Sequence, residues 1–321
     1  MKIWCNADLG EDGMRLLAAG VGAHDLVLSG TSNRSVLAEA RRDPALAEAD
    51  IAFGQPDPAD CLSGRILRWV EVSSAGYTRY DSDAFRDGML SRGVVFTNAS
   101  QVYADSCAQH VLAMMLALNR QLLASFRGQL GSRTWPYDER RAESRLLTGQ
   151  SVVMLGFGSI GTRLSALLAP FAGRIYAVRR RIHSEPGAHI VPEADLTRVL
   201  AEADHVVDLL PENDGTRGYV NARRIECFRP GARFYNVGRG ATVDQEALIR
   251  GLESGRIGAA YLDVTVPEPL PPGHPLWSAP NCFITPHTAG GRSDVNLELA
   301  RHFLANLAAF EKGRPMTDRI L

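Results

Sequence analysis

The chain has 321 residues, enough for two domains, and its 45% hydrophobic and 22% charged residues are ordinary for a globular protein. A formal net charge of −1 provides no global field that would favour nucleic acid or a membrane. Its five scattered cysteines lack paired spacing, which excludes a disulfide framework or a zinc site. With neither a secretory signal at residues 1–13 nor a long apolar run, we expect a cytoplasmic protein.

The first hundred residues alternate short apolar runs with helical patterns. Strands are expected at residues 2–5, 25–28, 51–53 and 67–72, and helices at 13–19 and 36–42. Strands that alternate with helices indicate parallel βαβ units. This part is therefore predicted to be a small α/β domain.

A long apolar helix is expected at residues 103–123, followed by a polar stretch at 124–148. A helix that is apolar on most sides is buried between layers or domains. The polar stretch is interpreted as an irregular excursion from the body of the protein. Its exposed position makes it a candidate for a dimer contact.

The alternation of strands and helices resumes at residue 151. Helices are expected at 162–168 and 295–310, and strands at 152–155, 174–178, 206–210, 234–237, 259–264 and 283–285. The predicted fold class is therefore α/β, with two Rossmann-like, doubly wound parallel-sheet domains.

A glycine-rich motif joins the strand at 152–155 to the following helix. It consists of Gly156, Phe157, Gly158, Ser159, Ile160 and Gly161. Gly156 permits the tight turn, Gly158 lets the backbone approach a diphosphate, and Gly161 permits close packing of helix on strand. Because the motif lies between a strand and a helix, it predicts dinucleotide binding rather than a purely structural turn.

The end of the next strand bears on which dinucleotide is used. NAD-binding proteins usually have an acid there for the ribose hydroxyl, but this chain has Arg179, Arg180 and Arg181. Guanidinium groups bind phosphate through charge-assisted hydrogen bonds. We therefore expect Arg179 and Arg180 to favour NADP(H). The alternative is a solvated basic loop, with NAD(H) bound through other contacts.

Arg239, Glu268 and His287 each follow a predicted strand. Ligands of open parallel sheets bind at the carboxyl ends of the strands. There, Arg239 could clamp a carboxylate, and Glu268 could favour a protonated His287 that gives a proton to a ketone. The alternatives are a structural histidine, a rigid-loop glutamate between prolines and a surface arginine.

Three long segments resemble the D-isomer-specific 2-hydroxyacid dehydrogenase family. They read LTGQSVVMLGFGSIG, FYNVGRGATVDQEALIRGLESGRIGAAYLDVTVPEPLP and NCFITPHTAG. The resemblance implies catalytic roles for Arg239, Glu268 and His287. It also implies cofactor contacts for Pro211, Thr216 and Asp263, and a substrate-binding turn at Ser74, Ala75 and Gly76.

The resemblance further implies a discontinuous domain arrangement. A substrate-binding (catalytic) domain would comprise 1–100 plus 291–321, and a dinucleotide-binding Rossmann domain would comprise 101–290, with an active-site cleft between them. Members of the family are usually homodimers. Tyr77 and Arg79 stand where many members have a glycine-rich loop, and Gln109 where many have glutamate. The first departure, at Tyr77 and Arg79, touches the expected substrate pocket and leaves the choice of substrate open.

We therefore predict an enzyme that reduces a small 2-keto acid, of the glyoxylate or hydroxypyruvate type, with NADPH. His287 would be the general acid. The basic run after Val178 resembles the NADPH-preferring branch of glyoxylate/hydroxypyruvate reductases. Two alternatives are a dehydrogenase of another small anion such as phosphite, and a non-catalytic protein that senses NAD(P).

Overall fold

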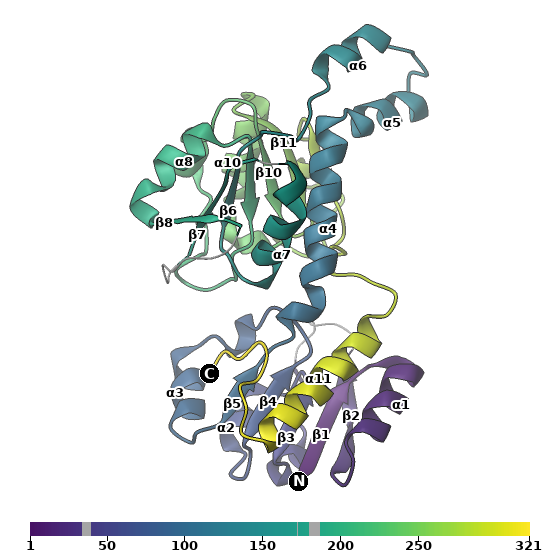
Figure 1. The fold of residues 1–321 in the computed structure, drawn as a ribbon, viewed down its shortest axis with the longest axis vertical. Helices are drawn as coiled ribbons and strands as arrows, with labels where there is room; N and C mark the ends of the chain where they lie inside the picture. The colour runs from purple at the N-terminus through teal and green to yellow at the C-terminus, as the bar shows by residue number, and fades with distance from the viewer. Residues whose placement is uncertain (34–39, 172, 180–186) are drawn as a thin grey trace. The chain divides into compact units, whose positions relative to one another are not determined.

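A computed structural model describes residues 1–33, 40–171, 173–179 and 187–321. The chain divides into two compact units, each built on a parallel β-sheet (Figure 1). The first unit comprises Met1–Tyr103 and Arg292–Leu321, and the second comprises Ala104–Gly291. The predicted α/β class with two parallel sheets is confirmed.

Within the described residues, the first unit has a five-stranded sheet in which all pairs are parallel. In sheet order its strands are β2 (Asp25–Asn33), β1 (Lys2–Ala7), β3 (Ile51–Gly54), β4 (Trp69–Val72) and β5 (Val95–Thr97). The order 2-1-3-4-5 is one of the two common doubly wound arrangements.

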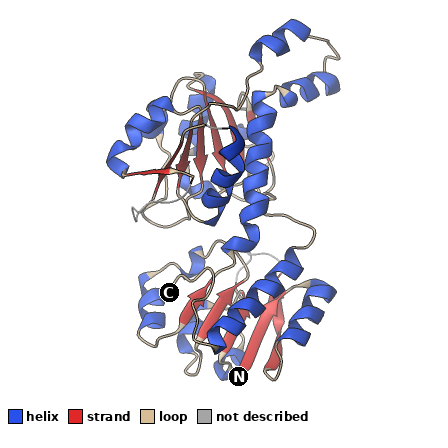
Figure 2. Ribbon diagram, viewed as in Figure 1, coloured by secondary structure: helices blue, strands red, loops and turns tan. Residues whose placement is uncertain are grey.

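Helices cover both faces of this sheet (Figure 2). They are α1 (Gly10–Gly20), α2 (Pro58–Ser63), α3 (Asp83–Leu90) and α11 (Val295–Glu311). On one face, Phe303 of α11 stacks on Phe53 and Trp69, with ring centroids 4.2 and 5.0 Å apart. On the other face, Phe85 of α3 packs in a cluster with Trp4. Alternate strand residues thus face the two layers.

The second unit has a seven-stranded sheet within the described residues, again parallel throughout. In sheet order its strands are β12 (Cys282–Ile284), β11 (Ile257–Leu262), β10 (Ala232–Asn236), β9 (His205–Asp208), β6 (Val152–Leu155), β7 (Ile175–Val178) and β8 (His189–Val191). The order reverses between β6 and β9. In doubly wound sheets, ligands bind beside the carboxyl ends of the strands at such a reversal.

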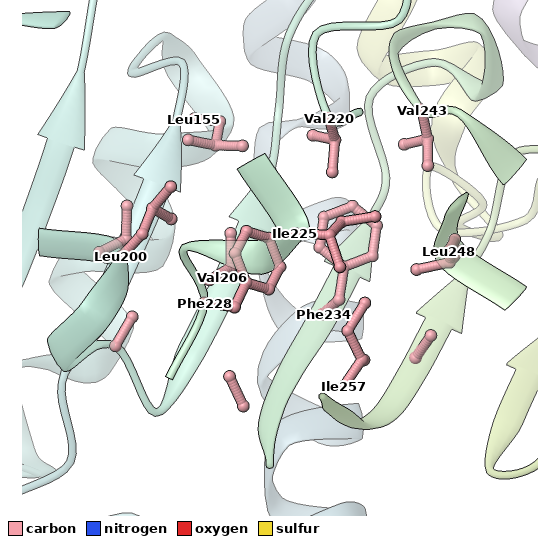
Figure 3. Close-up of a cluster of buried hydrophobic side chains, with 14 of the residues drawn as sticks. Leu155, Leu200, Val206, Val220, Ile225, Phe228, Phe234, Val243, Leu248 and Ile257 are labelled. Atoms are coloured by element: carbon pink, nitrogen blue, oxygen red, sulfur yellow. The ribbon is translucent and has the colours of Figure 1, made fainter. Parts of the chain in front are cut away.

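The second unit also contains helices. They are α4 (Ser100–Asn119), which begins within the first unit, α5 (Leu122–Leu130), α6 (Tyr137–Glu143), α7 (Ser159–Leu168), α8 (Leu196–Glu202), α9 (Ala222–Glu226) and α10 (Gln245–Glu253). Of these, α5 and α6 project from the body of the unit (Figure 1). Figure 3 shows the core on one face, where Val206 and Phe234 of the sheet meet Leu200, Ile225 and Leu248 of the helices. No helix in the described ranges is both long and apolar enough to cross a bilayer.

Several predicted elements differ from those observed. The helix expected at 103–123 ends at Asn119, and Gln121 has a φ of 57° before α5 begins. The stretch 124–148, expected to be irregular, contains most of α5 and all of α6. Of the helix expected at 36–42, residues 36–39 lie outside the described residues and 40–42 are not helical. The short strands β5 and β8 were not predicted.

Candidate active site

The glycine motif forms the turn between β6 and α7, and its three glycines meet different surroundings. Gly156 has a φ of +90°, which favours glycine. A Cβ on Gly161 would lie 3.0 Å from the Phe157 ring, whereas a Cβ on Gly158 would meet no described atom within 4 Å. No side chain caps the N-terminus of α7. The open space at Gly158 and the helix N-terminus therefore fit the diphosphate of a dinucleotide.

Arg179 directly follows β7, which pairs with β6. The backbone N–H of Gly156 donates to the carbonyl oxygen of Val178 over 2.9 Å, so Arg179 begins at the level of the glycine turn. In this fold the ribose that carries the 2′ group lies at the end of this strand. Arg180, also predicted to bind the phosphate, lies outside the described residues.

Arg239 lies in a turn after β10 that its flanking glycines make possible. A Cβ on Gly238 would lie 2.7 Å from the carbonyl oxygen of Leu210, and a Cβ on Gly240 would lie 2.2 Å from the backbone of Thr265. Real side chains do not approach backbone so closely, so the turn packs tightly between the loops after β9 and β11. This packing fixes the backbone from which the guanidinium extends.

The Arg239 side chain is partly buried and interacts electrostatically with Glu268. Burial lowers the pKa of Arg239, while Glu268 and Glu212 oppose that shift. The guanidinium Nη1 donates to the carbonyl oxygen of Gly238 over 2.6 Å. The cation therefore stands in a desolvated position that favours an anionic ligand.

Glu268 and His287 form a direct pair. Glu268 Oε2 lies 2.6 Å from His287 Nδ1, and Glu268 Oε1 accepts the backbone N–H of Thr265 over 3.0 Å. Burial alone would raise the pKa of Glu268, but hydrogen bonds from His287 and Thr265, aided by the charge of Arg239, lower it. Glu268 is therefore ionised near neutral pH, and it orients the imidazole.

The Nε2 atom of His287 is left for a ligand. Within the described part of the chain it has no hydrogen-bond partner, and the His287 side chain is 30% exposed. The residue has a φ of 54°, and its backbone N–H donates to the carbonyl oxygen of Asp263 over 2.9 Å. Backbone and side chain thus together fix the imidazole.

Asp263 holds the turn that carries His287. Its buried carboxylate accepts the backbone N–H groups of Thr288 and Ala289 over 2.8 and 2.9 Å, and the Thr285 hydroxyl over 2.5 Å. Thr285 Oγ1 lies 2.5 Å from the Tyr261 hydroxyl. The carboxylate is therefore engaged within the chain, and its contact with the nicotinamide carboxamide, which the resemblance implied, stays a prediction.

The loop after β9 contains the two residues expected on the adenosine side. The Thr216 hydroxyl donates to the carbonyl oxygen of Pro211 over 2.6 Å, which closes the loop.

At the end of β9 itself, Asp208 is buried. Burial raises the pKa of Asp208 to about 7, although the contacts with the Thr242 hydroxyl and the N–H of Leu210 oppose this shift.

Ser74, Ala75 and Gly76 form a turn after β4, in the first unit. The Ser74 hydroxyl donates to the carbonyl oxygen of Gly76 over 2.7 Å, and Asn98 Nδ2 donates to that of Ala75 over 2.7 Å. No described residue accepts a hydrogen bond from the backbone N–H of Ala75 or Gly76. These N–H groups are suited to an anionic ligand.

Residues 112–289, more than half of the chain, match the profile described as the NAD binding domain of D-isomer specific 2-hydroxyacid dehydrogenases. The chain belongs to the D-isomer specific 2-hydroxyacid dehydrogenase family. It is therefore an NAD(P)-dependent oxidoreductase of that family, and the resemblance inferred from its three segments is confirmed.

Several relatives of this dehydrogenase have been named by activity. A glyoxylate/hydroxypyruvate reductase B of Pectobacterium atrosepticum is 29% identical, over 84% of this chain and 85% of its own. A glyoxylate reductase of Aeropyrum pernix is 31% identical, over 77% of this chain and 74% of its own. A family member from Xanthobacter autotrophicus, solved with NADPH and MES, is 28% identical with a TM-score of 0.82, covering 100% and 98% of the two chains.

Sequence reasoning missed several residues that support the site of this dehydrogenase. Thr285 and Tyr261 extend the hydrogen bonds of Asp263, and the Tyr261 hydroxyl lies 2.5 Å from His110 Nε2. His110 and Tyr261 are separated by 151 residues, so no local pattern connects them. Thr242, which contacts Asp208, was missed for the same reason.

Proposed function

We propose that the protein reduces a small 2-keto acid, of the glyoxylate or hydroxypyruvate type, to the D-2-hydroxy acid with NADPH. The 2.6 Å pair of Glu268 and His287, at the sheet edge that also carries Arg239, supports this proposal most strongly. A carboxylate clamp beside a proton donor is what the reduction of a keto acid requires. The named reductases among the relatives support the same class of substrate.

In the proposed mechanism, the Arg239 guanidinium binds the substrate carboxylate and polarises the keto oxygen. His287 gives the proton on Nε2 to that oxygen, while Glu268 accepts the hydrogen bond from Nδ1–H and stabilises the charged imidazole before transfer. A bound nicotinamide would supply the hydride for the keto carbon. In the oxidation direction His287 is the base. The turn at Gly156–Gly161 would hold the diphosphate of the cofactor through backbone N–H groups.

We also infer a role for the first unit in binding the substrate. The N–H groups of Ala75 and Gly76 are proposed as donors to the substrate carboxylate, with Ser74 holding their turn through its bond to Gly76. Residues 1–100 plus 291–321 are accordingly proposed as the substrate-binding domain, and 101–290 as the dinucleotide-binding domain. Replacing Ala75 with proline removes one donor and should raise KM for the keto acid while leaving KM for NADPH unchanged.

The proposed preference for NADPH rests on Arg179 and, next to it, Arg180. The test is kcat/KM for NADPH and NADH in the wild type and in Arg179→Ala. Loss of one charge-assisted contact should lower kcat/KM for NADPH about tenfold or more and leave that for NADH nearly unchanged. Arg174→Ala is the matched control, because Arg174 precedes β7 and lies at its opposite end. Equal effects of both variants, or a wild type that favours NADH, would contradict the preference.

Steady-state oxidation of NADPH and NADH with a panel of keto acids tests the function itself. The panel is glyoxylate, hydroxypyruvate, pyruvate, phenylpyruvate and 2-ketoglutarate, with phosphite and NADP⁺ as a separate assay. Turnover of a small keto acid supports the proposal. Turnover of phosphite alone, or tight NADPH binding with no turnover of any substrate, would overturn it in favour of another dehydrogenase or a sensing protein.

We further propose a homodimer that forms through the segment 124–148. Leu130 and Trp135 in this segment are 86% and 90% exposed. Large apolar side chains so exposed on one segment are typical of an interaction surface. Light scattering should give twice the chain mass for the wild type and a smaller mass for Trp135→Ser. A monomeric wild type would contradict the proposal.

A further inference from the structure

Asp208 is a buried acid that the proposed chemistry does not use. It ends β9, is 0% exposed, and is in register with Asn236 of β10. Its Oδ1 accepts the backbone N–H of Leu210 over 3.0 Å, and its Oδ2 lies 2.6 Å from Thr242 Oγ1. Thr242 Oγ1 lies equally close, 2.6 Å, to the backbone carbonyl oxygen of Arg239. Asp208 is thus linked to the Arg239 turn by one hydroxyl.

The number of hydrogens decides which form of Asp208 fits this geometry. A threonine hydroxyl has one hydrogen, and a carbonyl oxygen only accepts. If Asp208 were ionised, the Thr242 hydroxyl could donate to either Asp208 or Arg239, and the other 2.6 Å contact would join two oxygens without a hydrogen. If Oδ2 is protonated, it donates to Thr242 and Thr242 donates to Arg239, so every contact contains a hydrogen.

We propose that Asp208 is a positioning residue, which in its neutral form fixes the Arg239 turn through Thr242. The inference rests on the proposed function for the role of Arg239. Asn236 holds the turn from the other side, since its Nδ2 donates to the Arg239 carbonyl oxygen over 3.0 Å and its Oδ1 accepts the N–H of Gly238 over 2.9 Å. The raised pKa of Asp208, about 7, agrees with a neutral acid at and below neutral pH.

Among the groups that face Asp208, none changes its charge near neutral pH. Leu155 of β6, Asn236 of β10 and Thr242 do not titrate. Tyr219, before α9, is within electrostatic reach, but burial and Glu193 raise its pKa, so it stays a neutral phenol. The charged Arg239 belongs to the turn itself. Ionisation of Asp208 above neutral pH would therefore leave one of the two contacts of the Thr242 hydroxyl without a hydrogen, and would loosen the turn that carries the carboxylate clamp.

Asparagine mimics the neutral acid, because its amide N–H₂ can donate to Thr242 and its oxygen can accept from Leu210. Between about pH 6 and 9, the wild-type KM for the keto acid should rise about tenfold, whereas KM of Asp208→Asn should match the wild-type value at the lower pH and stay level. Thr242→Val should raise KM about tenfold already at the lower pH, with a smaller effect on kcat. Asp214→Asn, an exposed acid in the following loop, is the control. A tenfold rise in KM for Asp208→Asn at the lower pH would overturn the inference.

Two readouts without catalysis separate this inference from the proposed function. Infrared spectra near pH 6 should show the C=O band of a protonated carboxyl that Asp208→Asn lacks. The native state holds the Asp208 proton more tightly than the unfolded state does. The wild type should therefore lose stability relative to Asp208→Asn as pH rises from about 4 to about 7. If no keto acid is reduced, the proposed function fails, and these two results still decide the state of Asp208. A missing band, or stability curves of wild type and Asp208→Asn that run parallel with pH, would overturn the inference about Asp208.

Discussion

Replacing Glu268 with glutamine tests the Glu268–His287 pair at the proposed centre of proton transfer. The amide nearly matches the carboxylate in size, and its oxygen can still accept the Thr265 N–H, so the loop should fold unchanged. What is lost is the negative charge 2.6 Å from His287 Nδ1. A hydrogen bond to a charged group contributes about 1.5–3 kcal/mol. Since about 1.36 kcal/mol corresponds to tenfold in rate, kcat for keto-acid reduction should fall about 10- to 100-fold.

Because the Glu268–His287 pair is partly exposed, we expect the decrease in kcat to lie in the lower half of that range. The side chains of His287 and Glu268 are 30% and 19% exposed, so solvent screens part of their interaction. Stopped-flow and steady-state oxidation of NADPH measure the loss, with KM for NADPH expected to change by less than about twofold. Glu246→Gln is the matched control, because Glu246 lies on α10 with its side chain 88% exposed. A Glu268→Gln enzyme with wild-type kcat would refute the role assigned to the pair.

Three further predictions concern the clamp, the cofactor turn and the first unit. Arg239→Lys should lower kcat/KM for the keto acid by about 10- to 100-fold, because an ammonium cannot form the bidentate contact; an unchanged value would exclude the clamp. Gly158→Ala should leave the unfolding temperature unchanged, since the added methyl meets no described atom within 4 Å, but should weaken NADPH binding in calorimetry about tenfold or more. Burial alone would lower the pKa of His302, but Asp318 and Glu71 raise it to about 9. His302→Gln should therefore destabilise the fold by about 3 kcal/mol below about pH 6.5, and the difference from wild type should shrink as pH rises through 9; equal differences at both ends would refute this.

The sequence was sufficient to predict the elements that carry strong local patterns. β6 and β7 are short apolar runs followed by glycine and arginine, and the structure has strands there. β5 and β8 have three residues each, too few to show a period. The end of α4 gave no signal either, because Gln121 takes a left-handed conformation without the glycine or proline that usually marks a break.

The residues of the candidate site also fall into those that the sequence predicted and those that it did not. Arg239, Glu268 and His287 were found because each follows a strand, and parallel strands bring their carboxyl ends to one edge. Asp208 and Thr242 are 34 residues apart, and they meet because β9 and β10 are neighbours in the sheet. Sheet order is a property of the whole fold and leaves no trace in local spacing. The supporting hydrogen bonds therefore had to come from the structure.

The glycine motif shows how structure adds a reason where sequence supplies only a pattern. Its three glycines look equivalent in the sequence, yet Gly156 is required by a φ of +90° and Gly161 by the Phe157 ring 3.0 Å from its would-be Cβ. Neither reason applies to Gly158, whose φ of −105° suits any residue and whose surroundings are open. A Cβ at this position would meet no described atom within 4 Å, so the packing of the folded chain does not require a glycine there. The space it would fill is the space that a diphosphate needs at the N-terminus of α7, so binding explains this glycine where folding does not.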